Sequence, residues 1–272
     1  MNKNAVIGIT VALLLPLASY LIGKKYSYEA TQMPRHYIYD STILKTVNGK
    51  QVEDTLWHKV PDFNLTNQLG QNVSWKGLEG KVVVADFFFT HCPTICPQLT
   101  QNMKRLQNGI MNAARAGSRS PDFIQFLSFS VDPERDSVKA LKAWADRFQI
   151  NPESWWLLTG PKKEIYDLSI EHMKVLAIDG GAVDTAFMHT DFMVLMDKHR
   201  NIRGYYHGLD TTAVARLSRD IVMLALEKDP QRKTFFKGNL EWLAVVFLVT
   251  IIGLGLLVYF LQKDKKHVAY IN

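Results

Sequence analysis

The stretch VVVADFFFTHCPTICP, residues 82–97, joins a mostly apolar run to the only two cysteines of the chain. The residues from Val82 to Phe89 predict a buried strand. Cys92 and Cys96 follow where that strand gives way to a helix, and a proline comes directly after each. Because prolines in a loop favour exposure, we expect both thiols to be accessible. The alternative is that they are buried cysteines that act as small hydrophobic residues.

The segments around this stretch predict an α/β domain. Predicted strands cover residues 61–66, 82–90, 123–131, 155–159, 192–196 and 202–206. Predicted helices cover residues 98–114, the segment from 137 to 148, 162–170 and 211–226. Strands that alternate with helices, followed by a hairpin and a final helix, predict a mixed sheet flanked by helices. With a dithiol after the first long strand, this order is the thioredoxin-like arrangement.

The spacing of the two cysteines predicts a site for chemistry. A cysteine at a helix N-terminus lies near unpaired amides and the positive end of the helix dipole, which favour its thiolate. Three intervening residues let both sulfurs reach one point, where they can close a disulfide or chelate a soft metal ion. Two thiolates favour Cu(I), or zinc with two further ligands. Because the chain has no second cysteine pair, we prefer a trigonal copper site completed by one imidazole.

The imidazole would come from one of eight histidines. His189 is the best candidate, because it precedes a predicted hairpin strand and in this arrangement that loop lies against the start of the first helix. An ordinary polar role in the loop is the alternative. His91 would need a strained geometry to share a metal with Cys92, so we expect it to be exposed. Three others have no partner that the sequence identifies: His58, His172 and His207.

Two uncharged apolar segments predict membrane spans. They cover residues 5–23 and 242–262, and each can cross about 30 Å of hydrocarbon as a helix. A cleaved signal peptide is the alternative for the first segment, but its apolar region is longer than usual and no small-residue cleavage site is obvious before Lys24. Two spans would place both termini on one side of the membrane and the middle of the chain on the other.

The net charge of +6 is concentrated beside these segments. Residues 1–25 contribute +3 and residues 232–272 contribute +4, which leaves −1 for the middle of the chain. Lipid head groups are therefore the expected counterpart of the basic residues, and nucleic acid is not an expected partner.

These observations predict six consecutive regions. They are an N-terminal transmembrane anchor (1–25), an extended juxtamembrane approach with one hairpin (26–59), the thioredoxin-like domain (60–228), a basic linker (229–241), a C-terminal transmembrane helix (242–262) and a tail (263–272).

The chain resembles the Sco/SenC family, which are membrane-tethered copper proteins with a thioredoxin fold. The resemblance covers about residues 60–227 and rests on four segments: PDF at 61–63, FFTHCPTICP at 88–97, SVDPERD at 130–136 and His189-Thr190. It implies that Cys92, Cys96 and His189 bind copper, with Cu(I) expected and Cu(II) left open. It also implies a role in building the dinuclear copper centre of cytochrome c oxidase subunit II. An upstream copper donor or a thiol reductant is left open as a further partner.

Two features depart from the pattern of the family. Met188 stands where family members often carry an acidic residue, so the surroundings of the imidazole differ. The second span is an addition to the single N-terminal anchor of the family.

Three functions remain open at this point. The first is copper delivery, and the second is a thiol–disulfide oxidoreductase that acts on cysteines of a client membrane protein. The third is a thiol peroxidase, for which Thr90 is present but no arginine is near it in sequence. A dithiol that cycles suits a compartment where disulfides form, so we expect the domain on the periplasmic side of a bacterial inner membrane, or its equivalent.

Overall fold

The computed structural model describes residues 33–47, 49–116, 121–175 and 190–227, with isolated helical positions at Leu14, Leu15, Ala18, Ser19 and Ile22. His189, the second predicted span, the basic linker and the tail lie outside the described residues, as does most of the first span. Among the helices of the described part, none is long and apolar enough to cross a membrane.

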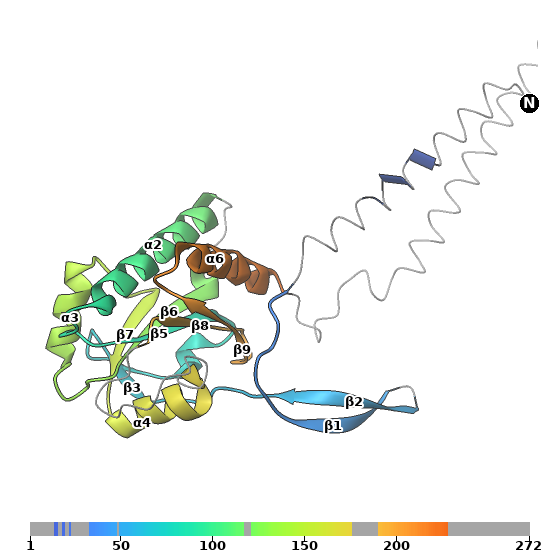
Figure 1. Cartoon of the computed structure of the whole chain (residues 1–272), viewed down its shortest axis with the longest axis horizontal. Coiled ribbons are helices and arrows are strands. Elements are labelled where there is room, and N and C mark those ends of the chain that lie inside the picture. The colour runs from blue at the N-terminus through green and yellow to red at the C-terminus, as the bar shows by residue number, and fades with distance from the viewer. Residues whose placement is uncertain are drawn as a thin grey trace, which may run out of the picture. The chain divides into compact units, whose positions relative to one another are not determined.

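A seven-stranded mixed sheet forms the centre of the domain (Figure 1). Its order is β4-β3-β7-β6-β5-β8-β9. The strands are β3 (Leu65–Asn67), β4 (Asn72–Val73), β5 (Val82–Phe88), β6 (Ile124–Ser130), β7 (Trp155–Thr159), β8 (Phe192–Met196) and β9 (Ile202–His207). The pairs β5–β6 and β6–β7 are parallel, whereas β8 is antiparallel to both β5 and β9. The predicted mixed α/β sheet is confirmed.

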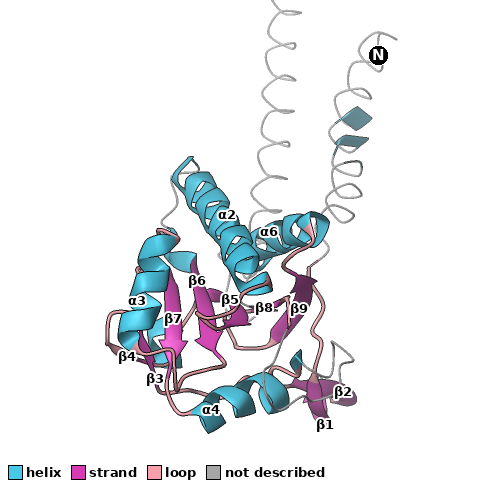
Figure 2. Cartoon of the chain, turned by 60° about the vertical axis from the view of Figure 1, so that its left-hand side comes forward, coloured by secondary structure: helices cyan, strands magenta, loops and turns pink. Residues whose placement is uncertain are grey.

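Helices pack against this sheet. They are α2 (Ile95–Ala116), α3 (Val138–Arg147), α4 (Lys162–Tyr166) and α6 (Thr211–Leu226), with 3-10 turns at Trp75–Leu78 and Pro121–Phe123. Helices α2 and α6 lie side by side in both views (Figures 1 and 2). The apolar stripe of α2 is buried as its helical spacing predicts, and every residue of β5, β6 and β8 is buried too. The core is therefore centred on the strand that leads to the cysteines.

The predicted hairpin ahead of the domain is also confirmed. Strands β1 (Tyr39–Val47) and β2 (Lys50–Trp57) form a two-stranded antiparallel sheet separate from the central one (Figure 1). Gly49 in the turn has a φ of 78°, a conformation that glycine adopts without a steric penalty.

Three predicted boundaries are wrong for local reasons. The strand expected at 61–66 begins only at Leu65, because the N–H groups of Phe63 and Asn64 donate to the carboxylates of Asp62 and Glu164 instead of to a neighbouring strand. Helix α2 begins at 95 rather than 98, so that it includes the second cysteine. The helix expected at 162–170 continues beyond α4 as a π-helix over Asp167–His172.

Candidate metal and dithiol site

The two cysteines lie at the junction of β5 and α2. Cys92 occupies a turn in which its N–H donates to the Phe89 carbonyl at 3.2 Å. Cys96 is the second residue of α2, and its N–H donates to Cys92 Sγ at 3.5 Å. A free amide at the helix N-terminus therefore points at the sulfur of Cys92, as the position of the motif predicts.

Both thiols are buried, which contradicts the expectation that they are accessible. Cys92 is 5% exposed and Cys96 is 3% exposed, and neither forms a disulfide. The turn closed by the Phe89 carbonyl holds Cys92 inward. Cys96 lies on the same face of α2 as Leu99 and Met103, which are fully buried, because residues three and seven positions apart share one side of a helix. Pro93 and Pro97, on which the prediction of exposure rested, follow the cysteines in sequence but do not expose their thiols.

The surroundings of the two thiols push their pKa values in opposite directions. Burial raises the pKa of Cys92, but hydrogen bonds from the Cys96 thiol and from the N–H groups of Cys96 and Thr94 outweigh it, so the net pKa is lowered. Burial raises the pKa of Cys96, and its hydrogen bond to Cys92 raises it further. Cys92 is thus the group that ionises first, while Cys96 keeps its proton. The hydrogen bond from the Cys96 N–H to Cys92 Sγ therefore distinguishes the two thiols.

A buried carboxyl group lies in the strand that leads to the site. Asp86 in β5 is 1% exposed and stands opposite Ser128 of β6, whose hydroxyl accepts the Trp155 Nε1 hydrogen at 2.9 Å. The Oδ1 atom of Asp86 has no hydrogen-bond partner among the described residues. Burial raises the pKa of Asp86 to about 7, and the charge of Asp86 in turn contributes to the raised pKa of Cys96. We did not predict this group, although an aspartate inside an apolar strand was its signal.

A second buried carboxylate fixes the backbone just before Cys92. Asp136 is fully buried and accepts the Thr90 N–H at 3.1 Å, the Thr90 hydroxyl at 2.5 Å and the Ser130 hydroxyl at 2.6 Å. The SVDPERD segment therefore holds the THC segment in place, a role that the sequence did not reveal. Because its hydroxyl is engaged with Asp136, Thr90 is not free to polarise a peroxide, which argues against the peroxidase reading.

The chain that follows His189 is fixed beside the first turns of α2. The N–H of Gly208 donates to the Asp191 carbonyl at 2.7 Å, and the Gly208 carbonyl accepts from Asn102 of α2, also at 2.7 Å. A Cβ atom at Gly208 would overlap the side chain of Leu99, which lies one turn beyond the second cysteine. Thr190 is 3% exposed. The residues directly after His189 thus lie against the helix that carries Cys96.

Comparison with known proteins agrees with this geometry. Residues 53–224 match the family model described as SCO1/SenC. This chain belongs to the SCO1/SenC family. The SCO1 protein homolog of Bacillus subtilis is 32% identical over 174 residues, which cover 64% of this chain and 86% of that protein.

Two further relatives bear on what members of the family do. The structure of BsSco is 30% identical, with a TM-score of 0.52, over 64% of this chain and 98% of that one. BsSco is described as having a disulfide switch and as a member of the Sco family of cytochrome c oxidase assembly proteins. A protein of Stutzerimonas stutzeri is 25% identical over 54% of this chain and 68% of its own, and is described as a putative copper-binding protein. The central domain thus has the thioredoxin-like fold of Sco structures.

The histidines within the described part of this SCO1/SenC chain do not complete a metal site. No group of three or more His, Cys, Asp or Glu residues in that part could hold a metal ion. His91 is exposed, as predicted. His207 has a partner after all, because its Nδ1 lies 2.9 Å from Asp191 Oδ1. His58 and His172 also have partners: His58 Nδ1 lies 2.7 Å from Asp40 Oδ1, and the rings of His58 and His172 stack on each other.

Proposed function

We propose that this chain is a membrane-tethered copper-binding protein that delivers copper to, or prepares, the dinuclear copper centre of cytochrome c oxidase subunit II. The observation that carries the proposal is the pair of thiols at the start of α2, with the pKa of Cys92 lowered and an amide directed at its sulfur. Thiolates are soft ligands that prefer Cu(I). The membership of BsSco in a family of cytochrome c oxidase assembly proteins supports a role in oxidase assembly, and the copper-binding description of the Stutzerimonas protein supports the metal.

In this proposal His189 supplies the third ligand. The position of Asp191, two residues after His189, supports this ligand. Asp191 is hydrogen-bonded to Gly208, and Gly208 is hydrogen-bonded to Asn102 of the helix that carries Cys96. Binding of Cu(I), the cargo, releases the thiol protons, and the helix N-terminus stabilises the negative charge of the sulfurs. The Asp136 contacts hold the backbone next to Cys92 in one geometry before the metal arrives.

The proposal also includes two membrane spans, at residues 5–23 and 242–262, and a domain on the extracytoplasmic side. The uncharged length of both segments and the basic residues beside them support it. Protease treatment of oriented vesicles tests it directly. Cleavage of the domain only from the cytoplasmic side would contradict the proposed orientation.

Copper content tests the ligand set. The full-length protein, purified in a neutral detergent and reduced, is loaded with Cu(I) in the absence of oxygen and desalted against a Cu(I) chelator. We expect one copper per chain in the wild type and none after His189→Ala or Cys92→Ser. His172→Ala is the matched control, because it removes an imidazole that stacks on His58 instead of one that pairs with Asp191, and it should leave copper binding unchanged. Equal copper in the wild type and in His189→Ala would refute the proposed site.

The opposite pKa shifts of the two thiols favour a second candidate function, thiol–disulfide exchange with a client protein. The Cys92 thiolate would attack one sulfur of a client disulfide and form a mixed disulfide, while the other client sulfur leaves as a thiolate and takes up a proton. Cys96 would then lose its proton and attack Cys92. This step closes the internal disulfide and releases the first client sulfur as a thiolate, which takes up the proton that Cys96 lost, so two electrons reach the client.

This second function does not need an imidazole ligand. The His189→Ala protein should therefore reduce a model disulfide at the wild-type rate even though it no longer holds copper. We also expect iodoacetamide to modify Cys92 before Cys96 in the reduced protein without copper, as judged by peptide mass. Modification of Cys96 first would contradict the assignment of Cys92 as the nucleophile.

A further inference from the structure

A basic cavity lies at the start of β5, at the opposite end of that strand from the cysteines. Its volume is about 470 Å³. Five cationic side chains from four separate segments line it: Lys59, Lys76, Lys81, Lys198 and Arg200. The middle of the chain has a net charge of only −1, so this convergence is local and does not reflect a generally basic domain.

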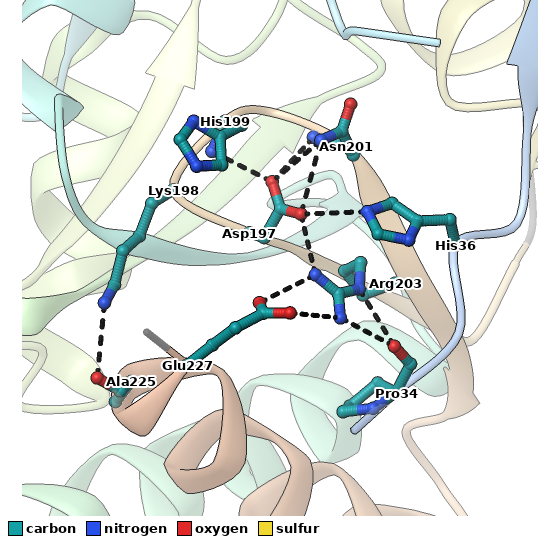
Figure 3. Close-up of polar contacts among 9 residues, drawn as sticks. All are labelled: Pro34, His36, Asp197, Lys198, His199, Asn201, Arg203, Ala225 and Glu227. Atoms are coloured by element: carbon teal, nitrogen blue, oxygen red, sulfur yellow. Dashed lines mark hydrogen bonds and ion pairs between the residues drawn. The ribbon is translucent and has the colours of Figure 1, made fainter. Parts of the chain in front are cut away.

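Three acidic side chains also line the basic cavity, and they offset the five positive charges only in part. The Asp62 carboxylate accepts the N–H groups of Phe63 and Trp75, both at 2.8 Å. Asp197 also lines the cavity, and its carboxylate binds Arg203 Nη1 at 2.9 Å and accepts N–H groups of its own turn (Figure 3). Glu79 is the third acidic residue, and it is exposed.

Three of the cations have no side-chain partner among the described residues. Within the part of the chain that the structure describes, the side chains of Lys59, Lys76 and Arg200 form no hydrogen bond or ion pair. Lys81 contacts only the neutral Gln125 amide, at 3.3 Å. Lys198 instead reaches the Ala225 carbonyl at the end of α6 (Figure 3). Five cations and three carboxylates line the basic cavity, which leaves a net formal charge of +2 that favours an anion over a cation there.

Two further features point to a ligand. Arg200 has a φ of 72°, a left-handed conformation that glycine or asparagine would adopt at lower cost, so the turn accepts strain to place an arginine there. Trp75 is 6% exposed, and its indole N–H is buried without an acceptor among the described residues. A buried donor that lacks a partner is costly, and this donor belongs to a residue that lines the basic cavity.

We propose that the basic cavity binds a phosphate group. A guanidinium and several ammonium groups suit a phosphate, because its oxygens accept from several directions at once. The group can be presented by an anionic phospholipid head group or by a soluble oligophosphate. The cavity is distinct from the dithiol, so this binding does not depend on copper.

Calorimetric titration of the full-length protein in neutral detergent at low salt tests the proposal. The probes are sodium tripolyphosphate and dihexanoyl phosphatidylglycerol below its micelle concentration, and dihexanoyl phosphatidylcholine is the neutral lipid control. The variant Lys59→Ala/Lys76→Ala removes two exposed charges of the basic cavity. Lys50→Ala/Lys139→Ala is the matched control, since it removes two exposed lysines elsewhere. Arg200→Asn removes a third charge and keeps a residue that tolerates the turn.

We expect saturable binding of one or both anions, with the affinity about tenfold weaker in the cavity pair and unchanged in the control pair. Arg200→Asn should weaken binding without lowering the melting temperature. Preference for tripolyphosphate identifies a soluble ligand, and preference for phosphatidylglycerol identifies a lipid. Absence of saturable binding to either anion, or equal weakening in the cavity and control pairs, would overturn the proposal.

Discussion

Replacement of Asp86 by asparagine should change the pH dependence of stability. The carboxyl group is buried in β5, with its Oδ1 unpartnered among the described residues, and burial raises its pKa from an ordinary value of 3.8 to about 7. Asparagine has nearly the same shape and keeps an oxygen that can accept the Ser128 hydroxyl hydrogen, but it carries no charge at any pH. The substitution therefore removes the titration and leaves the packing largely intact.

The magnitude follows from the pKa. A tenfold change in proton affinity corresponds to about 1.4 kcal/mol, so the shift from 3.8 to about 7 is worth about 4 kcal/mol. Below pH 4 both folded and unfolded chains hold the proton, and the carboxyl group has no net effect. As the pH rises towards 7, only the unfolded chain loses its proton easily, so the wild-type free energy of unfolding falls. Above pH 7 the full loss of about 4 kcal/mol is reached.

The asparagine variant should show the opposite ranking at the two ends of this range. Its amide hydrogens at the unpartnered position cost about 1–3 kcal/mol at all pH values. The variant should therefore be less stable than the wild type near pH 4 and more stable near pH 8. The difference in free energy should change by about 4 kcal/mol between these limits, or about 8–16 °C in melting temperature for a domain of this size.

Thermal unfolding of the full-length protein in neutral detergent measures this difference. Tryptophan fluorescence is a suitable signal, because Trp155 donates to Ser128 beside the carboxyl group. Asp146→Asn on the exposed side of α3 is the control for loss of one negative charge. A stability difference between Asp86→Asn and wild type that stays constant from pH 4 to pH 8 would refute the assignment of a raised pKa to this group.

Two other substitutions test the supports of the site by thermal unfolding and copper loading. Thr90→Val removes the hydroxyl that donates a hydrogen bond to Asp136, and it should lower the free energy of unfolding by about 1–3 kcal/mol. Thr42→Val, in the exposed hairpin, is the control and should have little effect. Equal effects of the two substitutions would argue that Asp136 does not anchor the segment before Cys92. Gly208→Ala places a methyl group into α2 and should lower stability by about 1–3 kcal/mol and weaken copper retention. Gly109→Ala is the control: its methyl group would lie in open space on α2, and it should raise the free energy of unfolding by about 0.5–1 kcal/mol. Unchanged copper retention in Gly208→Ala would argue against the proposed position of the third ligand.

The sequence predicts the order of strands and helices well because periodicity follows from burial. The strand at 155–159, the first hairpin strand at 192–196 and the helix at 211–226 have the bounds that their patterns predict. It fails at 61–64, where two carboxylates take the backbone N–H groups that a strand would use. One of them, Glu164, is 100 residues away, and a local pattern does not contain such a partner.

At the dithiol site too, the sequence predicts local features but not those that depend on tertiary packing. The cysteines, their position at a helix start and the exposure of His91 could be inferred from the residues alone. Their burial could not, because it depends on how α2 and the turn pack on the sheet. The role of Asp136 was also hidden, since its partner Thr90 lies 46 positions earlier in the chain.

The segment between the two buried thiols is short and partly exposed. Pro93 and Thr94, which separate the thiols, are both exposed. One backbone hydrogen bond, from Cys92 to Phe89, closes this turn, whereas the residues before it are held by Asp136 and those after it by helix α2. We expect a local opening of residues 92–94 to uncover Cys92 without disturbing β5 or α2. Cys96, on the core face of the helix, stays covered during such a movement. The thiol with the lowered pKa is thus also the one that we expect a partner to reach first, which is the order of events that the proposed transfer requires.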